Sequence, residues 1–287
     1  MIMRPKIFAL TALLGCMAFT RLYAPAETQT AQSAIATDNT PCASVNNTFN
    51  VGETLVYKIY YNWNFVWIPA GEVVFKVFDE GDKYHYQAKG RTYESYEWFY
   101  VVKDDYDSWV DKKTLLPLYS ERSVNEGDYH IFEKISFVQP ARQTAVWRAP
   151  KRGEKETKTE HKVNDCVHDV LSTLYFLRNI DFENRAKGYA MPFRVFMDQE
   201  EYPLKFKYEG KEARKKIYGL GRYNTMRFHP EVILGNVFKD GNKMQVWVSD
   251  DGNRLPLLIE SPISVGSVKM VLKSHKGLKY DLNTARK

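Results

Sequence analysis

The chain contains 287 residues, of which 41 are basic and 35 acidic, and 14% of its residues are aromatic. Three of the basic residues lie in an N-terminal segment that we expect to be removed, so the remaining chain has 38 basic and 35 acidic residues and a net charge of +3. A charge this small gives no support to nucleic-acid binding, which requires a clustered basic face. Residues 151–162 alternate Lys with Glu, which is typical of a solvated hairpin or loop.

Residues 1–26 have the pattern of a signal peptide. Arg4 and Lys6 precede an almost wholly apolar run, residues 7–20, which is shorter than the ~20 apolar residues of a membrane-spanning helix. The small residues around Ala26 favour cleavage there, and the alternative is lipidation of Cys16. We therefore expect a protein that is exported to the periplasm or to the outer membrane, with no integral membrane span after signal removal.

Cysteine usage agrees with export. If Cys16 leaves with the signal, only Cys42 and Cys166 remain, and an even pair in an oxidising compartment predicts a disulfide. Two unrelated thiols are the alternative. Residues 27–50 are rich in Thr, Ala, Ser and Asn, so we expect a flexible leader that is attached to the domain only through Cys42.

Residues 51–287 are expected to form a single β-rich domain. Apolar and aromatic side chains alternate with polar ones from Leu55 to Trp63, which is the signature of a strand with two different faces. A bend at residues 69–71 should separate this strand from the next. Further strands with the same alternation are predicted at 72–77, 84–92, 98–110, 119–124, 129–138, 144–148, 191–197, 202–208, 214–218, 225–229, 244–248, 255–260 and 267–272. The short connections favour antiparallel pairing.

One helix is predicted, at residues 167–178, because its apolar side chains recur on one stripe. Asn164 or Asp165 could cap its first turn. The helix should lie across a sheet. The fold class is therefore mainly β with one α-helix, built as a large antiparallel curved sheet, a half-barrel or a sandwich.

A short motif occurs twice in the chain. Trp-Val-Asp followed by Leu-Pro-Leu at residues 109–118 recurs as Trp-Val-Ser-Asp followed by Leu-Pro-Leu at residues 247–257. Each copy predicts a strand, an Asp-containing turn and a second strand opened by proline. The repetition suggests two related halves, 51–163 and 164–278.

Asp104 is the most unusual carboxylate of the sequence. Counting by two places it on the face that Trp98, Tyr100 and Tyr106 share, and an aspartate on an aromatic face must be paired, hydrogen-bonded or hydrated. A β-bulge that turns it outward is an alternative. We predict no catalytic residue, no metal site and no cofactor, since no His accompanies the nearby aspartates.

Several strings of the sequence resemble a known family, the one catalogued as domain of unknown function 3108. They lie at residues 60–63, 67–72, 90–93, 97–99, 260–263 and 265–268. The resemblance covers residues 51–278 and implies an exported protein of the Gram-negative envelope, without an activity to transfer. The repeated Trp-Val-Asp turn is similar, over a shorter stretch, to the lipoprotein carrier superfamily of LolA and LolB.

The first functional hypothesis is a binding or carrier protein for a hydrophobic or lipid ligand. The ligand would lie on the concave, aromatic face of the sheet, and the helix would close that face. The alternative interpretation of the aromatic residues is that they simply fill the core. The candidate ligand-binding residues are Tyr61, Trp63, Trp67, Trp98, Tyr100 and Asp104.

Two further hypotheses remain open. The protein could be a structural or assembly partner of envelope proteins, with the aromatic residues 93–100 as a docking surface. It could also be a carbohydrate-active enzyme, since such enzymes use paired carboxylates beside aromatic rings. The candidate carboxylates are Glu94, Glu97, Asp104 and Asp105, but no spacing among them identifies an acid and a base.

Overall fold

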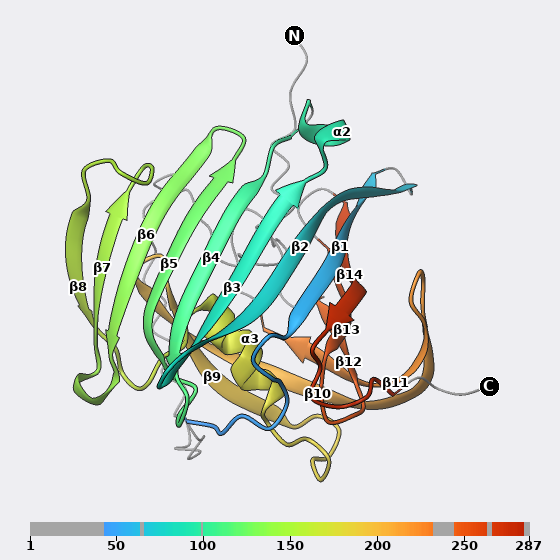
Figure 1. Ribbon diagram of the computed structural model, residues 1–287. Helices are drawn as coiled ribbons and strands as arrows, with labels where there is room; N and C mark the ends of the chain where they lie inside the picture. The colour runs from blue at the N-terminus through green and yellow to red at the C-terminus, as the bar shows by residue number, and fades with distance from the viewer. Residues whose placement is uncertain (1–42, 64–65, 99, 232–243, 263–265, 284–287) are drawn as a thin grey trace, which may run out of the picture.

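The computed structural model describes residues 43–63, 66–98, 100–231, 244–262 and 266–283. Its main feature is one antiparallel sheet of fourteen strands that curves around a single long helix, α3 (Val170–Arg178) (Figure 1). The expected mainly β fold with a large curved antiparallel sheet is thus confirmed. In the described ranges, no helix has the length and hydrophobicity that a membrane crossing requires.

The chain builds the sheet in two passes. The first pass consists of β1 (Thr54–Trp63), β2 (Val66–Glu80), β3 (Lys83–Thr92), β4 (Lys103–Asp111), β5 (Pro117–Glu126), β6 (Tyr129–Val138), β7 (Gln143–Ala149) and β8 (Thr157–Lys162). The second pass consists of β9 (Ala190–Met197), β10 (Glu200–Ile217), β11 (Gly221–Pro230), β12 (Gln245–Ser249), β13 (Pro256–Pro262) and β14 (Ser267–Lys276).

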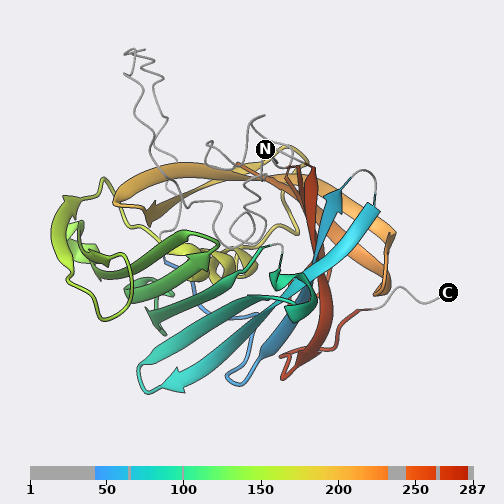
Figure 2. The ribbon, with the colours of Figure 1, turned by 90° about the horizontal axis from the view of Figure 1, so that it is seen from above.

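Helix α3 connects the two passes. Strands follow one another as neighbours within each pass, and β14 then pairs with β1, so that β8 and β9 are the two ends of the sheet. Seen from above, β9 and β10 lie on the opposite side of α3 from β3 and β4 (Figure 2). The helix contacts β3, β4 and β9 and therefore occupies the concave side.

Alternation of side chains explains how each strand separates the core from solvent. Along β4, Asp104, Tyr106, Ser108 and Val110 are buried, whereas the residues between them are partly exposed. Successive side chains of a strand point to opposite faces, so these four share the concave side. Ser108 confirms this position, because its hydroxyl donates a hydrogen bond of 2.5 Å to Asp169, the residue that caps α3.

Side chains join strands β5, β6 and β7 to the turn between β9 and β10. Arg122 of β5 contacts Asp198, in the turn between β9 and β10, at 2.5 Å and Glu133 of β6 at 2.9 Å. Arg148 of β7 pairs with the same two carboxylates. Beside them, His168 forms an isolated parallel bridge with Val195 of β9.

Two predicted elements differ from the structure in the first pass. The strand predicted at 98–110 starts only at Lys103, because a short helix, α2 (Glu94–Glu97), and its following loop occupy the preceding residues. The bend predicted at 69–71 is a β-bulge within the continuous strand β2, where Ile59 pairs with Gly71 and Tyr60 with Pro69. Ala70 is the residue left out of the pairing, and a bulge is one of the places where a strand accepts a proline.

Two further differences concern the second pass. The strands predicted at 202–208 and 214–218 form the single strand β10, whose register shifts near Gly210 and again before Lys215. The predicted helix begins three residues later than expected. Its N-cap is Asp169, whose carboxylate accepts the backbone N–H groups of Leu171 and Ser172, and neither Asn164 nor Asp165 has that role.

The twice-occurring motif forms two hairpins that share several backbone features. In both, the ladder shifts register directly after the tryptophan: between Trp109 and Val110 in β4, and between Trp247 and Val248 in β12. The residue two positions before the proline adopts a left-handed conformation in each copy, with φ of 57° at Leu115 and 47° at Arg254. Each indole N–H donates to a glutamate at 2.8 Å, Glu80 and Glu212 respectively. Whether residues 51–163 and 164–278 are related as whole halves stays a prediction.

Candidate ligand-binding cavity

An apolar cavity lies between α3 and the concave face of the second pass. Its volume is about 140 Å³. Residues of α3 form one wall, and strands β9 to β13 form the others. The apolar lining residues are Val170, Leu174, Leu177, Phe182, Phe193, Leu204, Phe206, Met226, Phe228, Pro230, Met244, Val246, Val248, Pro256 and Ile259.

The two faces of α3 are packed differently, and the larger space lies on the side of the second pass. The face that carries Tyr175 packs into the first pass, where the Tyr175 ring stacks on Tyr86 with centroids 3.9 Å apart and meets Phe49 edge-on at 5.0 Å. The side of the helix that carries Leu174 and Leu177 faces the second pass. Large rings thus fill one side of the helix, and shorter aliphatic side chains leave space on the other.

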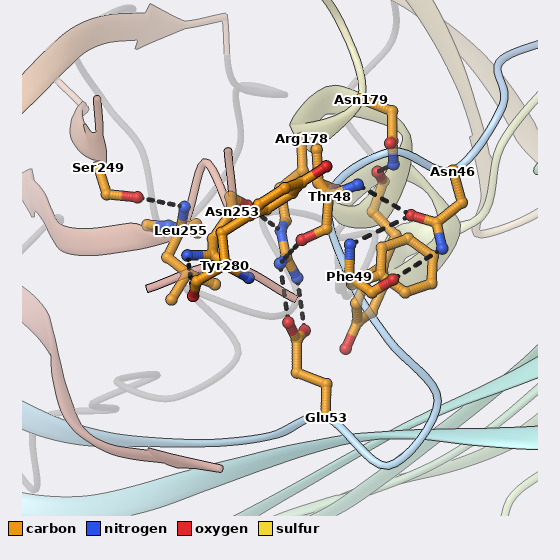
Figure 3. Close-up of polar contacts among 12 residues, drawn as sticks. Asn46, Thr48, Phe49, Glu53, Arg178, Asn179, Ser249, Asn253, Leu255 and Tyr280 are labelled. Carbon is orange, nitrogen blue, oxygen red and sulfur yellow. Dashed lines mark hydrogen bonds and ion pairs between the residues drawn. The ribbon is translucent and has the colours of Figure 1, made fainter. Parts of the chain in front are cut away.

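Arg178 lines the cavity, but its charge is compensated. Its guanidinium donates to both carboxylate oxygens of Glu53, at 2.6 and 2.9 Å (Figure 3). It also donates to the carbonyl oxygens of Thr48 and Asn253. Burial alone would lower the pKa of Arg178, but the charge and hydrogen bonds of Glu53 raise it above its ordinary value. The positive charge of Arg178 is therefore balanced by a carboxylate within the protein.

The same ion pair joins four distant segments of the chain (Figure 3). Arg178 ends α3, Glu53 precedes β1, and Asn253 lies between β12 and β13. Asn253 in turn exchanges two hydrogen bonds with the backbone of Tyr280, at 2.8 and 2.9 Å. The expected flexible leader is accordingly fixed near its end, since Phe49 is only 1% exposed.

The other charged residues of the lining are Glu231 and Arg254. Arg254 donates to the carbonyl oxygen of Ile180 at 2.6 Å and reaches the exposed carboxylate of Asp181 at 3.4 Å. With Arg178 neutralised by Glu53, the cavity has an apolar body and only a few polar groups. This composition is typical of small-molecule sites.

A smaller chamber of about 30 Å³ adjoins the cavity. The two spaces share the lining residues Leu174, Arg178, Pro256 and Ile259. At the chamber, the hydroxyl of Tyr57 donates to the carbonyl oxygen of Pro256 at 2.9 Å. Leu174, Pro256 and Ile259 are the apolar residues common to both spaces, so they lie at the boundary between them.

Of the six predicted ligand-binding residues, the five whose side chains the structure describes do not line this cavity. Tyr61 is buried in β1, and the side chain of Trp63 lies outside the described residues. Trp67 is partly exposed on β2, with the ammonium of Lys269 4.1 Å from its ring centroid. Trp98 is 82% exposed after α2, because the strand predicted to turn it inward does not extend so far.

Tyr100 and Asp104 are brought together, beside Glu126. Asp104 is fully buried on the concave side, as its predicted face requires, and it accepts the backbone N–H of Asn125 at 2.9 Å. Burial first, and the charge of Glu126 second, raise the pKa of Asp104 well above its ordinary value. Burial and the same two carboxylates also raise the pKa of the Tyr100 hydroxyl.

The four carboxylates that suggested an enzyme do not converge. Asp105 points away from Asp104 and pairs with Arg91 at 2.6 Å. Glu94 and Glu97 lie on α2, where Glu97 contacts Lys103 at 3.2 Å. Across the described ranges, no three His, Cys, Asp or Glu side chains are grouped so as to hold a metal ion.

Sequence reasoning missed the lining residues of the cavity. Phe206, Met226, Phe228 and Ile259 were all placed in predicted strands, but alternation shows only that they face a core. One signal could have indicated the site: the predicted helix is aromatic on one side and aliphatic at Leu174 on the other. Cys166 precedes the helix as expected, and its predicted partner Cys42 lies outside the described residues.

Solved structures of two other proteins are similar to this chain. A crystal structure of a beta-barrel-like protein of domain of unknown function DUF1849 from Brucella abortus superposes with a TM-score of 0.54 at 9% identity, covering 82% of this chain and 100% of that one. A protein with YmcC-like fold from Bacteroides fragilis has a TM-score of 0.29 at 10% identity, with the same coverage.

None of the curated proteins compared with the chain matches it. Residues 56–273 match the family described as "Protein of unknown function (DUF3108)". This match spans most of the chain and confirms the resemblance seen in its sequence strings, so the protein belongs to the DUF3108 family.

Proposed function

We propose that this protein is exported to the cell envelope and binds the apolar part of a small molecule or lipid in the cavity between α3 and β9 to β13. The observation that carries the proposal is the composition of the cavity. Fifteen of its nineteen lining residues are apolar, and its most buried charge, Arg178, is neutralised by Glu53. Such a space provides few hydrogen-bond partners for water.

The size of the cavity supports the same function. Apolar cavities of about 150 Å³ stay dry and take up molecules of the size of benzene. Each methylene group that leaves water contributes about 0.8 kcal/mol to binding. A cavity of about 140 Å³ can therefore supply useful affinity for an apolar group without any further polar contact.

Export is supported by the N-terminal pattern. A basic pair, Arg4 and Lys6, precedes the apolar run, and the predicted pairing of Cys42 with Cys166 requires an oxidising compartment. The mass of the protein purified from the periplasm tests this part. A chain that starts at Glu27 and gains no alkyl label without reductant is expected. An unprocessed chain with alkylated thiols in the cytosol would overturn it.

Ligand binding is tested by filling the cavity. Met226 is 3% exposed and lines the cavity, whereas its neighbour Arg227 on the same strand is partly exposed. Met226→Trp should abolish binding of an apolar fluorescent probe, and Arg227→Trp, the matched control, should retain it. Native mass spectrometry of the wild-type protein should show a bound lipid or alkyl probe. If the wild-type protein and both variants bind equally, or if none binds, the proposal is wrong.

One observation favours an assembly role as a second candidate. Trp98 is 82% exposed at the end of the aromatic segment that was predicted to dock partners. Exposed tryptophans are enriched where proteins meet. Capture of the same envelope protein by the wild-type chain but not by Trp98→Ala would support this role, and equal capture by both would exclude Trp98 from it.

A further inference from the structure

The length of the cavity has a physical limit at its inner end. Among the described residues, the space that adjoins the cavity at Leu174, Pro256 and Ile259 is the small chamber of about 30 Å³. That chamber ends at Tyr57, which is hydrogen-bonded to Pro256, and at the buried pair of Arg178 with Glu53. Opening this end would break a buried ion pair, which is strongly unfavourable.

We infer that the cavity accepts only a short apolar segment of its ligand, about six carbon atoms long, and that Leu174 determines this length. The inference rests on the proposed function and specifies its ligand class: an amphiphile bound by the end of one chain or by one ring, not by a whole long acyl chain. The number follows from volume, because a cavity of about 150 Å³ holds the six carbons of benzene and this one measures about 140 Å³.

A length limit has a measurable signature. Each methylene that is buried raises affinity about fourfold, since it contributes about 0.8 kcal/mol. Methylenes that remain in water add nothing. Affinity for straight-chain alcohols should therefore rise about fourfold per carbon up to roughly six carbons and then stay level.

Leu174 should shift this limit in both directions. Leu174→Ala removes three carbon atoms from the wall between the cavity and the chamber, so the two spaces join. The plateau should then move to chains about three carbons longer. Leu174→Phe puts a larger side chain into the same place and should move the plateau to shorter chains. The opposite signs distinguish a length determinant from general destabilisation.

The matched control is Leu115→Ala. Leu115 is fully buried in the first hairpin and lies outside the residues that line the cavity and the chamber. It loses the same three carbons, so it reproduces the stability loss without changing the cavity. Its plateau should coincide with that of the wild-type protein.

The experiment is isothermal titration calorimetry of the full mature chain with 1-alkanols from butanol to dodecanol. A wild-type plateau near six carbons, displaced oppositely in the two Leu174 variants and unmoved in Leu115→Ala, supports the inference. Affinity that keeps rising to dodecanol, or a plateau that ignores Leu174, overturns it and leaves the proposed function intact. If no alkanol binds at any length, the proposed function itself fails.

Discussion

The buried pair of Glu53 with Arg178 makes the sharpest prediction about stability. Both side chains are at most 5% exposed, and two hydrogen bonds join them. Glu53→Gln keeps the shape of the side chain but leaves the Arg178 charge without a counter-ion. Breaking a buried ion pair in this way costs about 3–5 kcal/mol. For a chain of this size, the midpoint of thermal unfolding should fall by roughly 10 °C.

The matched control is another Glu→Gln change at an ion pair on the surface. Glu97 contacts Lys103 at 3.2 Å, with side chains that are 32% and 54% exposed, so Glu97→Gln should cost less than about 1 kcal/mol. Urea denaturation is the assay, because urea, unlike guanidinium, does not screen charges. The reasoning is refuted if the two variants lose the same free energy of unfolding.

Two other predictions concern buried carboxylates. The raised pKa of Asp104 means that its contribution to stability is complete below the ordinary carboxyl pKa and is lost as pH rises through the folded-state value. Asp104→Asn should therefore stabilise the fold relative to wild type by about 1.4 kcal/mol for each pH unit above roughly 4, up to the pKa of Asp104 in the folded state. Urea denaturation between pH 4 and 8 measures this difference. A difference that does not change with pH would contradict the prediction. Asp169→Ala removes the observed N-cap and should lower the free energy of unfolding by about 0.5–2 kcal/mol. Asp165→Ala should lower it by less than about 0.5 kcal/mol. Equal losses of stability in thermal unfolding would contradict the assignment of the cap.

Local patterning predicted most strands because their two faces have different surroundings. The alternation around Tyr106 and Val110, for example, survives as buried positions separated by partly exposed ones. The same pattern cannot locate an irregularity. Pro69 falls at a bulge within β2, and the long strand β10 passes through Gly210 with a register shift, although both residues usually interrupt strands.

The buried polar pairs and the cavity could not be predicted from the sequence pattern, for a different reason. Arg122 of the first pass meets Asp198 of the second, and Glu53 meets Arg178 across 125 residues. Such partners are set by how far the sheet curves, which no local window contains. Asp104 was identified as unusual on its face, but its neighbour Glu126 was not.

The two hairpins share local backbone features, but the two sides of α3 are packed differently. Trp109 and Trp247 occupy equivalent positions with the same shift in register and the same indole donation to a glutamate. The difference comes from the side chains that face α3: Tyr86 stacks on Tyr175 in the first pass, whereas Met226 lies across an open space from Leu174 in the second. The stacked rings fill their side closely, whereas the leucines of α3 and the side chains of the second pass, phenylalanines among them, leave a space of about 140 Å³.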